Sequence, residues 1–250
     1  MTSLFLPFAA SFGPVPGEPW RYFSSPNDGL VEIGTVNGVA VALPIHFHDE
    51  DQITFVLSGR RRFIVGDELV TVSAGQGVVI PAGAPHRSLA EPLGVACINL
   101  YAAPGRYDDR DLISSLLKNE TQSEGIIRPM MLPITRLAMT SARVGPEPDS
   151  GATRESVTRA AQTAGMSREG YSRRFRKMHG VAPQHFWLME KLNDARQLLR
   201  AGEPIAEVAV ETGFADQSHL GRCFRRAFGA TPGRYRAGQA GSHPFQTKSL

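Results

Sequence analysis

The sequence predicts a two-domain α+β protein, in which an N-terminal all-β barrel or sandwich precedes a C-terminal all-α domain with two helix-turn-helix units. Short β-branched and aromatic runs recur about every ten residues between 30 and 101, separated by glycine and proline turns. From residue 153 to residue 236, apolar residues recur at helical spacing instead. The helical part also contains one unit twice, which predicts two copies of the same motif.

The charge of the chain is distributed unevenly along it. The 250 residues carry a net charge of +3 at pH 7. Residues 151–250 hold 16 Lys and Arg against 8 Asp and Glu, a net charge of +8, whereas residues 1–150 hold 11 against 16, a net charge of −5. A basic part joined to an acidic part predicts a nucleic-acid-binding module beside a module with another role.

The composition predicts a cytoplasmic protein without a membrane span. No apolar run approaches the roughly 20 residues that cross a bilayer. The apolar N-terminal segment has no preceding basic region and is broken by proline, so we interpret it as a docked arm and not as a signal peptide. Cys97 and Cys223 lie far apart in apolar patterns, which favours two buried reduced thiols over a disulfide.

The β region is predicted as a series of short strands that begins after a proline- and glycine-rich segment with little periodicity. Ser58–Gly59 and Gly66–Asp67 are predicted to be hairpin turns between strands. The predicted strands are Leu30–Val36, Val39–Leu43, Gln52–Leu57, Arg60–Val65, Leu69–Val72, Val78–Ile80, His86–Leu89 and Val95–Tyr101.

Between the two domains, Asp108–Asn119 has the pattern of a helix with an apolar stripe. The stripe can pack on the β domain or pair with a second copy of itself in a homodimer, and the sequence leaves both open. Gly145–Gly151 has the composition of a linker. The predicted boundaries are therefore 1–105 for the β domain, 106–150 for a helical and linker segment, 151–237 for the helical domain and 238–250 for a flexible tail.

The stretch Ile205–Arg236 has the pattern of a helix-turn-helix. Gly213 ends a short amphipathic helix, because glycine tolerates the left-handed conformation of a tight helix exit. Asp216 or Ser218 can cap the second helix, which has a basic surface that would fit the DNA major groove. Taken alone, the pattern fits an ordinary αα-hairpin equally well. The residues predicted to face the core are Phe214, Leu220, Phe224 and Phe228.

A second copy of this unit lies upstream, at Ser167–Trp187. Arg173 aligns with Arg222 and Gly180 with Gly229, each pair 49 residues apart. A long predicted helix between the copies can hold both recognition helices at a fixed separation. If both face one way, they could enter successive major grooves roughly 34 Å apart, so the repeat favours DNA binding over the plain hairpin.

Residues 153–236 resemble the DNA-binding domain of AraC/XylS-type transcription regulators. The resemblance rests on A-x3-G-F at Ala209–Phe214, S-x-L-x-R-x-F at Ser218–Phe224 and G-x-x-P-x-x-Y-R at Gly229–Arg236. It implies a bipartite seven-helix domain that binds DNA and is usually attached to an effector or dimerisation domain.

The resemblance also assigns base contacts to both recognition helices. Arginine can hold guanine O6 and N7, and glutamine can pair with adenine. Gly221 falls where the family often has a longer side chain, so contacts there are expected to be thin. The expected base contacts are Glu169, Ser172 and Arg173 in the first helix, and Gln217, Ser218, His219 and Arg222 in the second. The expected phosphate contacts are Arg174, Arg176, Lys177, Arg225, Arg226 and Arg236.

Two segments of the β region resemble the cupin motifs, which implies a cupin-like barrel. These are the run from His46 to Gln52 (HFHDEDQ) and the later Gly75-x5-Pro-x-Gly-x2-His86. In metal cupins, two histidines and a carboxylate of the first motif join a histidine of the second. Here His46, His48 and His86 are present, but Gln52, a weaker neutral ligand, takes the expected place of the carboxylate.

Three readings of these histidines stay open. They can line a metal-free effector pocket, hold a divalent metal such as Zn, Ni or Fe, or form the catalytic centre of a metal cupin. A fused DNA-binding domain favours sensing over turnover, because a regulator needs different affinities in two states and not chemistry.

The sequence therefore predicts a regulator of transcription that is not an enzyme. Its expected partners are double-stranded promoter DNA, a small-molecule or metal effector, a second copy of itself and, for an activator, RNA polymerase, with no membrane partner. The alternative is a metal-dependent cupin oxygenase or isomerase fused to a nucleic-acid-targeting module.

Overall fold

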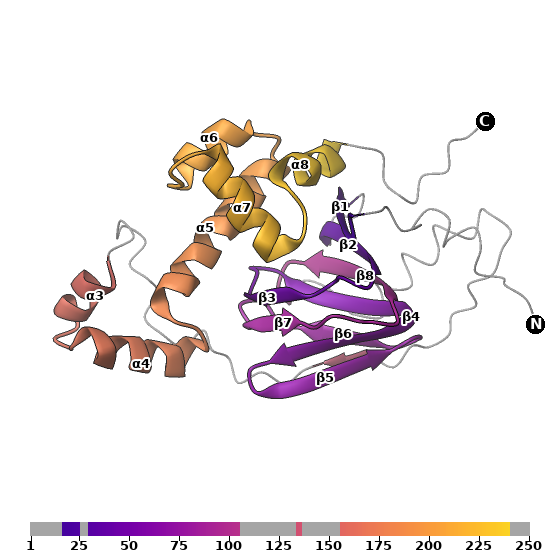
Figure 1. Cartoon of the computed structure of the whole chain (residues 1–250), viewed down its shortest axis with the longest axis horizontal. Coiled ribbons are helices and arrows are strands. Elements are labelled where there is room, and N and C mark those ends of the chain that lie inside the picture. The colour runs from indigo at the N-terminus through magenta and orange to yellow at the C-terminus, as the bar shows by residue number, and fades with distance from the viewer. Residues whose placement is uncertain (1–16, 26–29, 106–133, 137–155, 241–250) are drawn as a thin grey trace, which may run out of the picture.

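The computed structural model describes residues 17–25, 30–105, 134–136 and 156–240. An N-terminal β domain and the C-terminal helices lie side by side (Figure 1). The strands are β1 (Trp20–Ser24), β2 (Leu30–Gly38), β3 (Leu43–His46), β4 (Asp51–Val65), β5 (Glu68–Ser73), β6 (Gly77–Ile80), β7 (His86–Ser88), β8 (Val95–Ala102) and β9 (Ile134–Arg136). The helices are α3 (Val157–Thr163), α4 (Arg168–His179), α5 (Pro183–Arg200), α6 (Ile205–Glu211), α7 (Gln217–Phe228) and α8 (Pro232–Ala240).

The long strand β4 belongs to both faces of the barrel. One face has the strand order β1-β2-β8-β4-β6-β9, and the other joins β3, β7, β4 and β5. The first half of β4 pairs with β6 and β8, and its second half pairs with β5 and β7. All pairs are antiparallel except β6 with β9, which brings three residues of the segment predicted as helical or linker into the sheet.

The predicted hairpin turn at Ser58–Gly59 is wrong, because β4 runs through it without a break. A register shift between Val56 and Ser58 forms a bulge, and Gly59 has a φ of 73°. A bulge bends a strand and increases its twist, and here it carries β4 from one face of the barrel to the other. The Ser-Gly pair that predicted a hairpin turn therefore marks a bend within one strand.

Two further strand predictions differ from the structure. Residues 39–42 are not a strand, and β3 begins only at Leu43. β1 was missed in a segment with little periodicity, although Trp20 and Tyr22 alternate inward as a strand requires. The helix predicted at Asp108–Asn119 and the linker at Gly145–Gly151 lie outside the described residues.

The helical predictions are largely confirmed. α4 lies within the predicted upstream unit Ser167–Trp187, and Ser167 caps it by accepting a hydrogen bond from the Gly170 N–H at 3.1 Å. Gly213 has a φ of 69° at the end of the α6 turn. The residues predicted to face the core of the second unit are all buried: Phe214, Leu220, Phe224 and Phe228. Of the two free cysteines, Cys97 is buried and Cys223 is half-buried.

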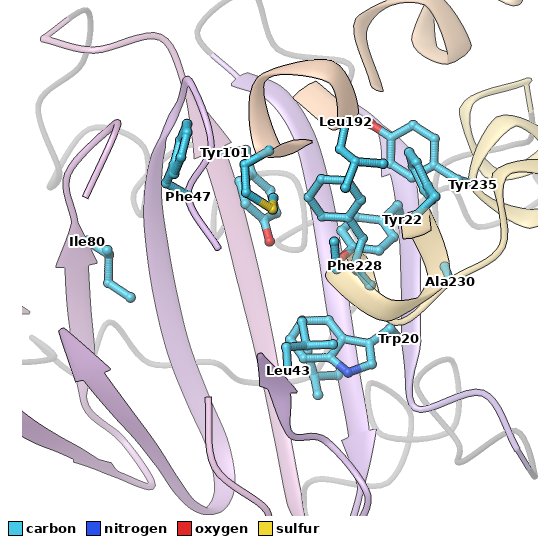
Figure 2. Packing of buried hydrophobic residues seen from close by; sticks show 14 of the residues in the cluster. Trp20, Tyr22, Leu43, Phe47, Ile80, Tyr101, Leu192, Phe228, Ala230 and Tyr235 are labelled. Carbon is cyan, nitrogen blue, oxygen red and sulfur yellow. Dashed lines mark hydrogen bonds between the residues drawn. The ribbon is translucent and has the colours of Figure 1, made fainter. Parts of the chain in front are cut away.

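The two domains share one hydrophobic core. Trp20 and Tyr22 of β1 pack with Leu192 of α5, Phe228 of α7 and Tyr235 of α8 (Figure 2). The Tyr22 hydroxyl donates a hydrogen bond to the Phe228 carbonyl at 2.8 Å, across the boundary between the domains.

Glycine allows the closest approach between the domains. A Cβ atom at Gly238 would lie 2.0 Å from the Tyr22 carbonyl oxygen, and one at Gly229 would lie 2.3 Å from Cδ1 of Trp20. Both distances are far below van der Waals contact, so α8 and the end of α7 can lie this close to β1 only with glycine at these positions.

Candidate nucleic-acid interface and barrel pocket

The second helix-turn-helix unit, α6 and α7, presents a basic surface to solvent. The Asp216 carboxylate accepts a hydrogen bond from the His219 N–H at 2.7 Å and caps α7. Leu220 and Phe224 are fully buried on the inner side of the helix. The predicted DNA contacts Gln217, Ser218, Arg222, Arg225 and Arg226 are exposed. His219 is half-buried, and its ring packs edge to face with the Phe214 ring, with the centroids 5.3 Å apart. It therefore has less freedom than its neighbours to reach a base.

The first unit, α3 and α4, presents the corresponding residues on a less buried helix. Glu169, Arg173 and Arg176 are exposed, and Ser172 is half-buried. α4 has no buried residue among its twelve. Its inner side consists of half-buried aromatic rings. The ring centroid of Phe175 lies 5.4 Å from that of Phe186 in α5. The structure therefore places both predicted recognition surfaces in solvent, but the inner side of α7 is buried and that of α4 is only half-buried.

Two predicted phosphate contacts of the first unit, Arg174 and Lys177, are also exposed. Arg236 differs, because its guanidinium donates to the Glu203 carbonyl at 3.2 Å. This bond joins α8 to the segment before α6. Arg236 therefore contributes to the folding of the second unit, a role that the sequence did not indicate.

A buried ion network that the sequence did not reveal joins the barrel to the helices. Glu32 of β2 and Arg196 of α5 form an ion pair, and Arg196 also lies 3.4 Å from Glu50. Arg200 reaches Glu50 at 2.8 Å, and the Tyr235 hydroxyl donates to Glu32. Two carboxylates and two guanidiniums balance one another in a site closed to water.

The same network explains the ionisation of Glu50. Burial would raise the pKa of its carboxyl group, but Arg196 and Arg200 together lower it to about 2. Glu50 is thus an anion in the folded protein at neutral pH. A single acidic residue in an apolar strand pattern, Glu32, and two arginines one helical turn apart are the only signals of this network in the sequence.

Inside the barrel, the structure brings together the three predicted histidines. The ring centroids of His46 and His86 lie 4.3 Å apart, and those of His48 and His86 lie 5.1 Å apart. Nδ1 of His46 lies 2.9 Å from the Pro44 carbonyl, and Nδ1 of His86 lies 2.9 Å from the Ala84 carbonyl. These contacts direct Nδ1–H to the backbone and leave Nε2 of each ring to face the interior.

His48 differs because both its ring nitrogens are engaged. Nδ1 lies 2.6 Å from the Glu50 carbonyl, and Nε2 lies 2.9 Å from the side-chain amide of Gln52. Gln52 in turn contacts Thr54, whose hydroxyl lies 2.7 Å from the Asn99 amide. Gln52 is thus part of an amide and hydroxyl chain inside the barrel.

Burial decides the charge of these rings. It lowers the pKa of His46 to about 3, and it lowers the pKa of His86 well below its usual value, with the neighbouring histidines acting in the same direction. Nε2 of His86 is buried and has no hydrogen-bond partner in the described part of the chain. At neutral pH the barrel therefore presents uncharged imidazoles with available lone pairs.

Among the residues that the structure describes, no three His, Cys, Asp or Glu side chains are placed to hold a metal ion. His46 and His86 have the tautomer that metal ligands adopt, but Nε2 of His48 is held by Gln52. The carboxylates of Glu50 and Asp51 are engaged elsewhere, with Arg200 and with the Ala82 N–H. In this arrangement Nε2 of His46 and Nε2 of His86 can accept hydrogen bonds.

A cupin-like barrel joined to a paired helix-turn-helix defines the class of protein. Residues 160–238 match the model of a helix-turn-helix domain, and residues 35–91 match the model of the cupin domain. The chain thus contains a helix-turn-helix domain and, N-terminal to it, a cupin domain, the two domains that the sequence predicted. No helix in the described ranges is long and apolar enough to cross a membrane.

The similarity to curated relatives covers about a third of this chain. MtrA, an HTH-type transcriptional regulator of Neisseria gonorrhoeae, is 32% identical over 81 residues, which cover 32% of this chain and 27% of MtrA. RclR, an RCS-specific transcriptional activator of Escherichia coli, is 35% identical over 81 residues, which cover 32% of this chain and 28% of RclR. The match thus spans less than a third of either relative.

One solved structure resembles both domains together. ToxT of Vibrio cholerae, solved with a bound unsaturated fatty acid, aligns with a TM-score of 0.50 and covers 84% of this chain and 95% of its own. The identity is 14%, so this likeness concerns the fold alone.

Proposed function

We propose that this protein is a sequence-specific DNA-binding regulator of transcription whose cupin domain responds to an effector. The observation that carries the proposal is the repeated recognition helix. Arg173 and Arg222 occupy the same position of the repeat, and both are exposed on helices with an N-terminal side-chain cap. The named relatives of this helical domain regulate transcription, which supports the same role here. A promoter-binding protein of this kind works in the cytoplasm.

Salt-dependent binding to promoter DNA tests this proposal. The logarithm of the affinity is expected to fall linearly with the logarithm of salt concentration, with a slope of roughly −0.9 for each phosphate contacted. Removal of one phosphate contact, in R176A or R225A, is expected to weaken binding to all sequences and to reduce the slope by about 1. Equal affinity for all duplexes in the wild type, or no salt dependence, would contradict the proposal.

For the barrel, we propose an effector that donates hydrogen bonds to the neutral imidazoles of His46 and His86. The buried Nε2 of His86, which has no partner, supports an acceptor role. The Gln52 contact of His48 and the absence of a third free ligand in the described barrel favour this role over a metal or catalytic centre. We accordingly propose that the protein is not an enzyme.

Elemental analysis of protein purified without a histidine tag tests the barrel proposal. Metal well below one equivalent, unchanged in H46A, is the expected result. One equivalent of zinc, nickel or iron that disappears in H46A would overturn it in favour of a metal-sensing barrel.

A further inference from the structure

A cleft lies between the barrel and the recognition helix of the second unit. Its volume is about 810 Å³, within the range of roughly 300–1,000 Å³ that small-molecule sites occupy. The barrel contributes Trp20 of β1 and the segment from Asn37 to Pro44, and the helical side contributes α7 and Gly229. A smaller opening of about 460 Å³ adjoins it at Trp20 and Arg225.

The two walls of this cleft differ in chemistry. The barrel wall is apolar and includes Val39, which is 54% exposed, and Leu43. The α7 wall consists of three arginines, Arg222, Arg225 and Arg226. A ligand that satisfies both walls has an apolar body and an anionic head.

The charge of the surroundings favours an anion. No carboxylate among the described residues forms an ion pair with the three arginines of α7. The carboxylate in the cleft wall, Glu18, is already paired with Arg234. Beneath the cleft, the buried guanidinium of Arg61 lies 5.2 Å from the Trp20 ring and donates only to backbone carbonyls. Its charge adds to the positive potential at the same place.

Trp20 supplies an independent observation. Trp20 is 6% exposed, and its Nε1–H has no hydrogen-bond acceptor among the residues that the structure describes. A buried donor without a partner costs about 1–3 kcal/mol, and a ligand oxygen at this position would remove that cost. Trp20 lines both openings, so it belongs to the wall that they share.

We propose that this cleft binds a small amphipathic anion, with a phosphate or carboxylate head on the arginines of α7 and an apolar body against the barrel wall. The site is distinct from the histidine pocket. Since Arg222, Arg225 and Arg226 are also the proposed DNA contacts of the second unit, the anion and DNA would bind α7 in mutual exclusion. This last consequence rests on the proposed function, whereas the binding site itself does not.

The first unit supplies a matched control. Arg173, Arg176 and Lys177 occupy the repeat positions of Arg222, Arg225 and Arg226, but they line neither opening. R176A and R225A therefore remove equivalent arginines, of which only the second borders the cleft.

Octyl phosphate is a suitable probe, read by the fluorescence of Trp20 in a W187F background, which leaves Trp20 as the one tryptophan. Saturable binding is expected in W187F and in W187F/R176A, and roughly tenfold weaker binding in W187F/R225A. Octyltrimethylammonium has the same chain with a cationic head, and inorganic phosphate has a head without the chain, so neither is expected to bind. Calorimetry on the unmodified chain, R176A and R225A gives the same comparison independently of W187F.

Equal binding of the cationic amphiphile, equal affinity of the R176A and R225A variants, or binding to phosphatidate vesicles without binding of the monomer would overturn the proposal. Competition with a labelled duplex separates this site from the regulatory function. If octyl phosphate binds as expected but the protein binds no DNA, the site stands and the proposed function fails. If specific DNA binding is present and octyl phosphate does not bind, the reverse holds.

Discussion

The two helix-turn-helix units have the same local design but different support. In the second unit, Leu220 and Phe224 are fully buried, and the end of α7 packs against β1 and β3 of the barrel. In the first unit, α4 buries no residue, and its inner rings are only half-covered. A repeat in the sequence can therefore specify two equivalent recognition surfaces without giving the two units equal stability.

α5 connects this difference to the barrel. Its C-terminal half carries Arg196 and Arg200 into the buried ion network with the barrel. Its N-terminal half contacts the strand of the histidine pocket, where Nε2 of His185 lies 2.8 Å from the Ile45 carbonyl and Phe186 packs on Phe47. The histidines on either side of Phe47 face the barrel interior. The segment from Ile45 to His48 thus contacts the histidine pocket on one side and, on the other, the N-terminal half of α5, against which α4 packs.

Removal of Arg196 has the largest expected effect on this comparison. R196A leaves the buried Glu32 with Arg200 and the Tyr235 hydroxyl, and it leaves Glu50 with Arg200; breaking such a buried network costs about 3–5 kcal/mol. The free energy of unfolding, measured in urea, is expected to fall by that amount. R176A on the exposed face of α4 is the control and should change it by less than about 0.5 kcal/mol. A loss below 1 kcal/mol in R196A would show that the domains do not depend on the network.

A drop in pH has the next largest expected effect, and it acts on the barrel. The pKa values of His46, His48 and His86 are lowered in the folded state by burial. The unfolded chain therefore binds more protons below about pH 6.5, and the stability that is complete above that pH is lost as the pH falls. Each histidine contributes a slope of up to about 1.4 kcal/mol per pH unit.

Urea unfolding between pH 7 and pH 5, in the presence of a chelator, measures this slope. H86Q is expected to have a shallower dependence than the wild type, whereas H219Q, outside the barrel, keeps the wild-type slope. Identical slopes in the wild type and H86Q would contradict the assignment of a buried neutral His86.

Removal of the helix caps has the smallest expected effect on stability, and it compares the two units most directly. S167A and D216A each remove one cap, at a cost of about 0.5–2 kcal/mol. In α4 nothing buried compensates, so amide hydrogen exchange in its first turns is expected to accelerate roughly 2- to 30-fold. In D216A the buried side of α7 holds the helix, and the same exchange should change less. Equal acceleration in both helices would mean that the barrel does not support the second unit.

Local signals explain which parts of this fold could be predicted from the sequence. α4 and α7 carry their own caps and exit glycines, Ser167 with Gly180 and Asp216 with Gly229, and both helices begin and end as these residues predict. The turn at Gly66–Asp67 is equally local. Ser58–Gly59 is also a glycine-containing pair typical of a turn, but pairing along β4 continues through it, and nothing near it in the sequence shows that.

The domain interface depends on contacts that no local pattern encodes. Glu32 and Arg196 are 164 residues apart, and the pairing of Tyr22 with Phe228 spans 206. The histidines of the barrel could be found because His46, His48 and His86 belong to two recognisable sequence motifs. The Gln52 contact that engages His48 required the structure, since it depends on how β4 and β8 pair and bring Asn99 beside Gln52 and Thr54.

The central claim is that α4 and α7 each recognise one element of a DNA site. The most direct test is selection of binding sites from random duplex DNA with the wild type, R173A and R222A. The wild type is predicted to enrich one asymmetric site with two sequence elements about one helical turn, roughly 10 base pairs, apart. R173A should relax the preference at one element and R222A at the other, each at a cost of about 1–3 kcal/mol in affinity for the selected site. No enriched sequence with the wild type, or loss of the same element in both variants, would contradict the account.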